Sequence, residues 1–304
     1  MAATDPCYEL EPWFGITCDA AGDHVTRVHL GGRNLSGTLP HNINDLTRLE
    51  QFTVEHNQLA GSIPSLSGLT ALEVFSVFGN QLTGPIPDLS GLTALRVFIA
   101  GNNQLTGSIP SLSGLTALQY FSVGANQLTG PIPSLSGLTS LRGFDVDNNQ
   151  LTGSIPSLSG LTALEVFRVF GNQLTGPIPD LSGLTALRVF IAGNNQLTGP
   201  ISDLSGLTAL ETFIVSDNQL IGTPPAAPAS LLAGRSALCP NHLSGPSPTD
   251  AAWTAATGGT HWSQHCRAAR ATDATNIPTL GQWSLMLLGL LAAGIGARRL
   301  QRAG

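Results

Sequence analysis

The sequence predicts a solenoid of stacked coils, and three observations support this prediction. A unit such as residues 69–91 repeats almost unchanged through the middle of the 304-residue chain, and most copies carry proline at a fixed place. Self-similarity with a period of about 20 to 50 residues is typical of folds in which each unit buries its apolar face against the next. One asparagine marks every unit after the first, and these residues are Asn57, Asn80, Asn103, Asn126, Asn149, Asn172, Asn195 and Asn218.

The repeated unit has a recognisable pattern. Residues 69–91 read LTALEVFSVFGNQLTGPIPDLSG, or L-x-x-F-x-V-x-x-N-x-L-x-G-x-I-P-x-L-x-x-L when extended by the next leucine. This pattern resembles the leucine-rich repeat, and its L-T-G-x-I-P half resembles the plant-type subclass. The resemblance implies a right-handed coil with a concave parallel β-sheet and a convex side of short extended or 3-10 segments. Nine units fit, from about residue 22 to about residue 228.

Within one unit, the segment around Phe75 and Val77 is predicted to form a short strand, because alternate side chains of a strand point to opposite faces. A single coil cannot cover its apolar residues, so neighbouring coils must stack. The asparagine stands where the chain leaves the strand, and its amide can satisfy backbone groups of the turn. Proline at positions 85 and 87 excludes a regular helix on the convex side.

Four segments are expected along the chain. Residues 1–21 form an N-terminal cap and residues 22–228 the repeats. Residues 229–276 form a C-terminal cap and linker, and residues 277–304 form a separate tail. The first repeat is atypical, because Arg33 takes the place of the asparagine. A polar and irregular end coil is what a terminal repeat requires, since one of its faces meets a cap or solvent.

The four cysteines form two local pairs that flank the repeats. Cys7 and Cys18 bracket a Trp-Phe segment that resembles the end of a plant-type N-terminal cap, and this resemblance implies a cystine there. Cys239 and Cys266 bracket Trp253 and Trp262, as in a C-terminal cap. Cysteine pairs at both ends indicate disulfides and an oxidising compartment. Zinc is the alternative at the second pair, because three nearby histidines would complete a ligand set. These histidines are His242, His261 and His265.

Composition excludes several functions. The formal net charge is −6, only 11% of the residues are charged, and the chain contains no lysine. Schiff-base chemistry and lysine-dependent phosphate loops are therefore excluded. No basic stripe follows the repeats, so nucleic acid is not an expected partner. Motifs of serine hydrolases, zinc proteases and kinases are missing. We expect no enzymatic activity, no cofactor and no resident metal.

The concave sheet is the expected binding face, because leucine-rich-repeat proteins generally bind there. Two apolar clusters are predicted on it, separated by a polar strand that carries Asp145 and Asp147. Exposed apolar surface often marks an interaction site, whereas β-branched residues also simply suit a sheet surface. The Asp pair is interpreted as a solvated polar patch. The candidate ligand-binding residues are Val74, Phe78, Val97, Ile99, Tyr120, Asp145, Asp147, Arg168, Phe170 and Ile191.

The C-terminal tail has the features of a targeting segment. Residues 280–297 are mostly apolar, and Arg298, Arg299 and Arg302 follow at once. As a helix this segment spans about 27 Å, enough for the bilayer core, with the arginines on the cytoplasmic side. Its motif, Ile277, Pro278, Thr279, Leu280 and Trp283, resembles the IPTL-CTERM family of sorting signals. The resemblance implies a bacterial protein that is processed near the motif by a membrane-embedded exosortase-type enzyme. Ser284 departs from the glycine usual after the tryptophan.

Export needs a signal that the first residues lack, because Met1 to Tyr8 contain neither a basic region nor an apolar one. The N-terminal cap also lacks the helix usual before its first cysteine. We therefore expect the true start to lie upstream.

These observations predict a protein of the cell envelope or surface of a Gram-negative bacterium. Its concave face would bind another macromolecule, and a protein is the expected ligand. Two alternatives remain at this point. One is an adhesin or spacer without a discrete ligand, and the other is an effector-like mimic of plant repeat proteins.

Overall fold

The computed structural model describes residues 7, 13–245, 250–259 and 261–263, all within the first of two compact units, Met1–Ala268. The predicted sorting motif and the apolar segment 280–297 lie outside the described residues. Within the described part, no helix has the length and hydropathy needed to cross a membrane.

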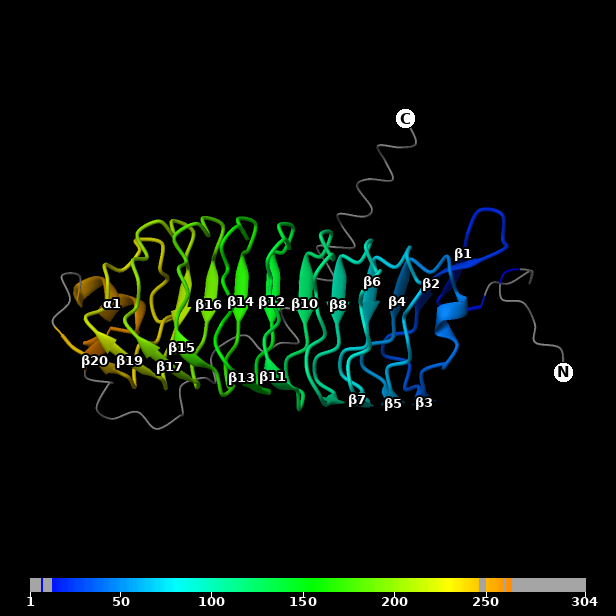
Figure 1. Ribbon diagram of the computed structural model, residues 1–304, viewed down its shortest axis with the longest axis horizontal. Helices are drawn as coiled ribbons and strands as arrows, with labels where there is room; N and C mark the ends of the chain where they lie inside the picture. Colours follow the sequence, from blue (N-terminus) through cyan, green and yellow to red (C-terminus); the bar gives the residue numbers. More distant parts are fainter. Residues whose placement is uncertain (1–6, 8–12, 246–249, 260, 264–304) are drawn as a thin grey trace, which may run out of the picture. The chain divides into compact units, whose positions relative to one another are not determined.

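The first unit is a solenoid of leucine-rich-repeat type, as predicted. Its concave sheet has ten strands in the order β1-β2-β4-β6-β8-β10-β12-β14-β16-β18 (Figure 1). Every neighbouring pair is parallel except β1 and β2. The bounds are β1 (Ile16–Cys18), β2 (Val25–His29), β4 (Gln51–Thr53), β6 (Val74–Ser76), β8 (Val97–Ile99), β10 (Tyr120–Ser122), β12 (Gly143–Asp145), β14 (Val166–Arg168), β16 (Val189–Ile191) and β18 (Thr212–Ile214).

A second row of parallel strands runs along the coils beside the concave sheet, and it forms the lower row of labels in Figure 1. The order is β3-β5-β7-β9, then β11-β13, then β15-β17-β19-β20, and single bridges at Ser108↔Thr129 and Ser154↔Thr175 join the three groups. We call these strands together the second sheet. The bounds are β3 (Ser36–Thr38), β5 (Gln58–Ser62), β7 (Gln81–Gly84), β9 (Gln104–Leu105), β11 (Thr129–Pro131), β13 (Gln150–Thr152), β15 (Thr175–Pro177), β17 (Gln196–Gly199), β19 (Gln219–Gly222) and β20 (His242–Leu243).

The asparagine ladder joins each coil to the one before it. In a typical case, Asn126 donates from Nδ2 to the carbonyls of Ala100, Val123 and Gly124. Its Oδ1 accepts from the N–H of Leu105 at 2.9 Å. One side chain thus satisfies backbone groups of two coils that would otherwise be buried without partners.

Directly before each ladder asparagine from Asn57 to Asn218 the chain adopts a left-handed backbone just after the strand. Glycine occupies this place in two coils, with φ of 66° at Gly79 and 65° at Gly171. Most other coils use Asn, Asp or His there, and Ala125 is the exception with φ 53°. Glycine, asparagine and aspartate tolerate this region best, so the turn explains the residue types.

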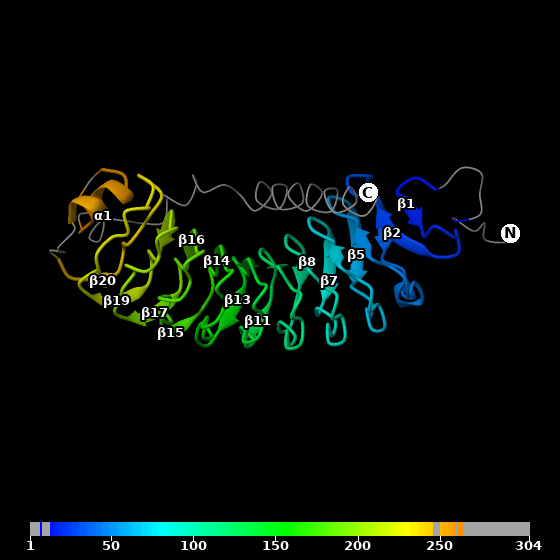
Figure 2. The same cartoon turned by 90° about the horizontal axis from the view of Figure 1, so that it is seen from above.

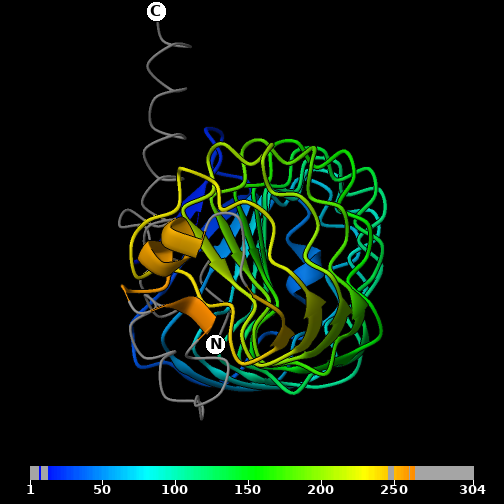
Figure 3. The same ribbon diagram turned by 90° about the vertical axis from the view of Figure 1, so that its left-hand side faces the viewer.

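The core is a continuous stack that runs through the coils. Inward leucines lie on either side of a column of phenylalanines, and these rings stack at centroid separations of 5.5 to 5.7 Å. The column comprises Phe52, Phe75, Phe98, Phe121, Phe144, Phe167, Phe190 and Phe213. Seen end-on, the coils lie behind one another around this common core (Figure 3). On the convex side the chain forms turns, with a 3-10 turn at Ile43–Asp45 in the first coil.

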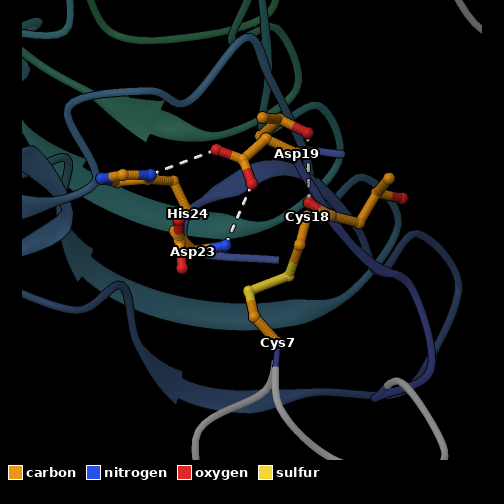
Figure 4. Close-up of a disulfide and its surroundings, with 7 residues drawn as sticks. Cys7, Cys18, Asp19, Asp23 and His24 are labelled. Carbon is orange, nitrogen blue, oxygen red and sulfur yellow. Dashed lines mark hydrogen bonds and ion pairs between the residues drawn. A yellow bond between two sulfur atoms is a disulfide. The ribbon is translucent and has the colours of Figure 1, made fainter. Parts of the chain in front are cut away.

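The N-terminal cap contains the predicted Cys7–Cys18 disulfide. Close to it, Asp19 accepts hydrogen bonds from the N–H of Asp23 and from the His24 ring (Figure 4). The guanidinium of Arg33, which replaces the ladder asparagine, lies 4.0 Å from the centre of the Phe14 ring. A cation over an aromatic face is favourable, so this pair helps to close the first coil.

The repeats continue further than the sequence pattern predicts. Asn241 stands one period after Asn218, accepts from the N–H of Leu220, and donates to the carbonyls of Val215 and Leu238. It is therefore a further ladder residue, and the predicted end of the repeats at residue 228 is too early. The prediction missed this coil because its sequence departs from the repeat pattern where a strand is expected. In the structure the coil joins the concave sheet through a single bridge, between Ile214 and Ala237.

Trp253 and Trp262 close the C-terminal end, where both side chains are fully buried. Helix α1 (Asp250–Ala256) carries Trp253, whose ring meets Phe213 at a centroid distance of 6.0 Å and ends the phenylalanine column. Trp262 donates from Nε1 to Asp250 at 2.6 Å. The predicted Cys239–Cys266 pair includes a residue outside those described, as does the zinc alternative, which needs Cys266 or His265. His261 lies 3.6 Å from the Asp250 carboxylate.

Candidate ligand-binding face

Seven of the ten predicted binding residues stand on one face of the concave sheet, because its strands are in register, and Phe78, Asp147 and Phe170 each lie two residues beyond a strand end. Each strand contributes a first and a third residue to this face, and the residue between them points into the core. The first positions form one column, Val74, Val97, Tyr120, Gly143, Val166 and Val189. The third positions form the next column, Ser76, Ile99, Ser122, Asp145, Arg168 and Ile191.

Aromatic side chains on this face lie over glycines of the following coil. The ring of Phe78 lies 3.4 Å from the place where a Cβ on Gly101 would stand, and that of Phe170 lies 3.2 Å from the equivalent place on Gly193. The Tyr120 ring lies only 2.8 Å from the equivalent place on Gly143. Any larger residue at these glycines would push the ring away. The glycines therefore set the positions of the three aromatic rings.

The face exposes less apolar surface than the sequence predicts. Of the ten residues, only Tyr120, Asp145, Arg168 and Phe170 are partly exposed, whereas the other six are buried, including Val97 at 0% and Ile99 at 1%. Side chains of neighbouring strands stand about 4.8 Å apart, so they cover one another. The two predicted apolar clusters are consequently not open surfaces. The partly exposed residues among the ten lie on or just after the central strands β10, β12 and β14.

Two carboxylates and one guanidinium form an ion cluster in this central part. Arg168 donates to Oδ2 of Asp147 from Nε at 2.8 Å, and its Nη2 lies 2.6 Å from the same oxygen. The other oxygen of Asp147 accepts from the N–H of Phe170 at 2.6 Å. Asp145 accepts from the N–H of Asp147 at 3.0 Å and lies 4.0 Å from the guanidinium. We call these three residues the Asp145–Asp147–Arg168 cluster.

When both aspartates are ionised, the cluster has two negative charges and a single positive charge, that of Arg168. Burial raises the pKa of Asp145 above its usual range. Burial, together with the neighbouring Asp145 carboxylate, raises the pKa of Asp147 to about 7. Carboxylates so close together resist simultaneous ionisation. The two aspartates therefore titrate as one coupled unit that takes up a proton near neutral pH.

The prediction that the Asp pair is a solvated patch is wrong. Asp147 is completely buried, and its partner comes from the next coil. One difference between two copies of the repeated block points to this contact in the sequence. Residues 69–91 and 161–183 are identical except that Ser76 is replaced by Arg168, and the register places Arg168 beside Asp145. In the first copy, Ser76 is buried and its hydroxyl has no hydrogen-bond partner.

Ion pairs line the edge of the concave sheet, just before the strands. Each joins equivalent positions of successive coils, as in Arg142–Glu165 and Arg188–Glu211, both at 2.6 Å. Glu73–Arg96 continues the series at 3.6 Å. Pairs of this kind, partly or largely exposed to solvent, contribute little to stability. Within the described part of the chain, no three His, Cys, Asp or Glu residues gather as ligands of a metal ion.

Comparison with known proteins bears out both resemblances. Residues 275–302 match the IPTL-CTERM motif. Over 63 residues the chain is 38% identical to the nodulation receptor kinase of Pisum sativum, which covers 20% of this chain and 7% of that protein. The chain thus spans a small fraction of the curated relatives that it matches.

Solved structures give the same result for the fold. The plant peptide hormone receptor RGFR1, in complex with RGF2, matches with a TM-score of 0.61 and 32% identity over 69% of this chain and 35% of that one. A plant ice-binding protein matches with a TM-score of 0.53 and 25% identity over 81% of this chain and 88% of that one. The repeats thus have plant-type homologues both by sequence and by structure.

Proposed function

We propose that this chain is an exported protein whose leucine-rich repeats bind a protein ligand through the concave sheet. The observation that carries the proposal is the accessible centre of that sheet. Tyr120 and Phe170 flank the Asp145–Asp147–Arg168 cluster there, and each ring is held over a glycine. Aromatic and arginine side chains in fixed positions are the types that dominate protein interfaces. The likeness to a peptide receptor ectodomain supports a peptide or protein ligand.

Export and surface sorting follow from the IPTL-CTERM motif. An exosortase-type enzyme would process the chain near Leu280, and the residues beyond the motif would be missing from the mature protein. Intact-mass analysis of the protein from its native host tests this. A mature species that still contains residues 285–304 would contradict sorting, whereas one that ends near the motif would support it.

The binding proposal is tested by changing the centre of the face. The double variant Tyr120→Ser and Phe170→Ser removes both rings and leaves the core intact. Ile221→Ser is the control, because Ile221 is exposed apolar surface on the second sheet. Each form would be cross-linked to partners on the surface of its host. A ligand should be lost from the double variant and kept by the control. A spacer without a ligand would give the same result for all three forms.

A second function, ice binding, is favoured by a separate observation. The likeness to a plant ice-binding protein, with a TM-score of 0.53, extends over 88% of that protein. A short repeat domain with a regular uncharged surface suits such a role. Thermal hysteresis of the purified full chain tests it, since an ice-binding protein lowers the freezing point below the melting point.

A further inference from the structure

The outer face of the second sheet is uncharged, and glutamine and threonine side chains recur on it in a regular array, with Pro131, Pro177 and Ile221 as apolar exceptions. Its strands read Q-L-T-G or a close variant, with the leucine buried and the glutamine and threonine exposed. From β5 to β19 these strands contain no charged residue. The exposed glutamines are Gln58, Gln81, Gln104, Gln127, Gln150, Gln173, Gln196 and Gln219, and the exposed threonines are Thr83, Thr106, Thr129, Thr152, Thr175 and Thr198.

Side chains of this face form rows across the strands. Thr129 lies opposite Gln150 on one side and Ser108 on the other. The same row of Gln, Thr and Ser recurs two coils earlier around Thr83 and two coils later around Thr175. Neighbouring strands are about 4.8 Å apart. The coils follow one another along the solenoid (Figure 2), so the rows of side chains recur along the same axis.

The array is also rigid. The N–H of Gln127, Gln150 and Gln173 each donates at 2.8 Å to the carbonyl of the leucine in the preceding coil. Each threonine follows a leucine that is completely buried, such as Leu128 or Leu151. β-Branched side chains have few rotamers, so the hydroxyl and methyl groups of the threonines are held in position.

These properties suit a periodic and neutral ligand better than a protein. Protein interfaces are enriched in aromatic residues and arginine, which this face lacks among its strands β5 to β19. Without charge it has little means to steer a charged partner. A rigid lattice of hydroxyl, amide and methyl groups can instead order water molecules in a matching lattice.

We propose that the second sheet is the ice-binding surface of this protein, with the rows centred on Thr83, Thr129 and Thr175 as its contact points. This inference rests on the second function proposed above and assigns it to a face. The concave sheet remains available for a protein ligand, because the two sheets present different sets of side chains.

The chain supplies its own matched control. A second column of exposed threonines recurs with the same period in the convex turns, including Thr116, Thr139 and Thr162. These residues share composition, exposure and period with the proposed contact points, but they lie in turns rather than in paired strands. The test compares two triple variants of the full chain. One is Thr83→Lys, Thr129→Lys and Thr175→Lys on the second sheet, and the other is Thr116→Lys, Thr139→Lys and Thr162→Lys on the convex side.

Thermal hysteresis and partitioning into growing ice are measured for both variants and for the unchanged chain, with melting temperature as the check on folding. The expected result is activity in the unchanged chain and in the convex variant, and loss of activity to the level of buffer in the second-sheet variant. An inactive unchanged chain would overturn ice binding altogether. An active second-sheet variant that is folded would overturn the assignment of the face while leaving ice binding in place.

Discussion

At the scale of single residues, the same side-chain type serves different purposes according to its place in the coil. Ladder asparagines are polar yet buried or half-buried, because their amides pair with backbone groups of two coils. The asparagines just before them, such as Asn148 with φ 52°, are exposed and serve the left-handed turn instead. Two adjacent asparagines of one coil therefore have different structural roles. The first forms the left-handed turn, and the second pairs with backbone groups.

The Asp145–Asp147–Arg168 cluster makes stability depend on pH. The pKa of Asp147 is about 7 in the folded chain, whereas aspartate in an unfolded chain titrates near about 3.9. Between these values the folded state holds a proton that the unfolded state has released. We therefore expect the free energy of unfolding to decrease as the pH rises from about 4 to about 7, and to level off above that.

Urea unfolding at a series of pH values measures this decrease. Asp147→Asn should flatten it, because a single carboxylate would then remain beside Arg168. Asp45→Asn is the control, since Asp45 is exposed in the first coil, where Asn42 donates to its carboxylate, and makes no contact with the cluster. An unchanged pH dependence in Asp147→Asn would show that another group is responsible.

Arg168→Ser restores the residue found in the first copy of the repeated block, but it leaves the buried Asp147 and the half-buried Asp145 without a cation. Removing one partner of a buried ion pair costs about 3 to 5 kcal/mol, so we expect a loss of this order above pH 7. The loss should be smaller at pH 5, where the aspartates hold a proton. Arg188→Ser removes a mainly exposed arginine and should cost at most about 1 kcal/mol. Equal losses in the two variants would contradict the account of the cluster.

At the scale of elements, the phenylalanine column is the part of the core that joins every coil to its neighbours. Strands of three residues provide few backbone hydrogen bonds of their own, so packing between coils has to stabilise them. Each ring in the middle of the column stacks on two others, as Phe121 does on Phe98 and Phe144. Trp253 of α1 ends the column, which ties the C-terminal cap to the repeats.

Phe121→Ala should destabilise the solenoid by about 3 to 5 kcal/mol, because it removes a buried ring and leaves a cavity between two others. Urea denaturation measures the loss. Tyr120→Ala is the matched control on the adjacent position, where the ring is only partly buried, and a smaller loss is expected there. If both variants lose the same free energy, stacking within the column does not stabilise the coils in the way described.

At the scale of the whole molecule, the solenoid is modular because coils contact mainly their neighbours. Deletion of residues 115–137 removes one complete period and brings two equivalent positions together. Stability of such arrays is approximately a sum over repeats and their interfaces. The shortened protein should therefore fold, with the dependence of unfolding on urea reduced in proportion to the buried surface that is lost. Deletion of residues 115–131 is the control, because it breaks the period and should prevent cooperative unfolding.

The sequence by itself determined the period, the inward and outward positions and the ladder, because a repeat of this length and pattern admits one way of burying its leucines. The column of inward phenylalanines follows from the same pattern, and the Cys7–Cys18 disulfide follows from the resemblance of the cap. The place of Asn241, one period after Asn218, also follows from the repeat. The prediction did not include it because the surrounding coil departs from the repeat pattern.

Only the tertiary structure decided which outward residues are accessible and which of them meet. Arg168 and Asp147 belong to successive coils, and stacking of these coils brings the two side chains to 2.6 Å. The same stacking covers Val97 and Ile99, which alternation alone places on an open face. Alternation within one strand sets the direction of a side chain, whereas exposure and pairing depend on the neighbouring coils that stand about 4.8 Å away.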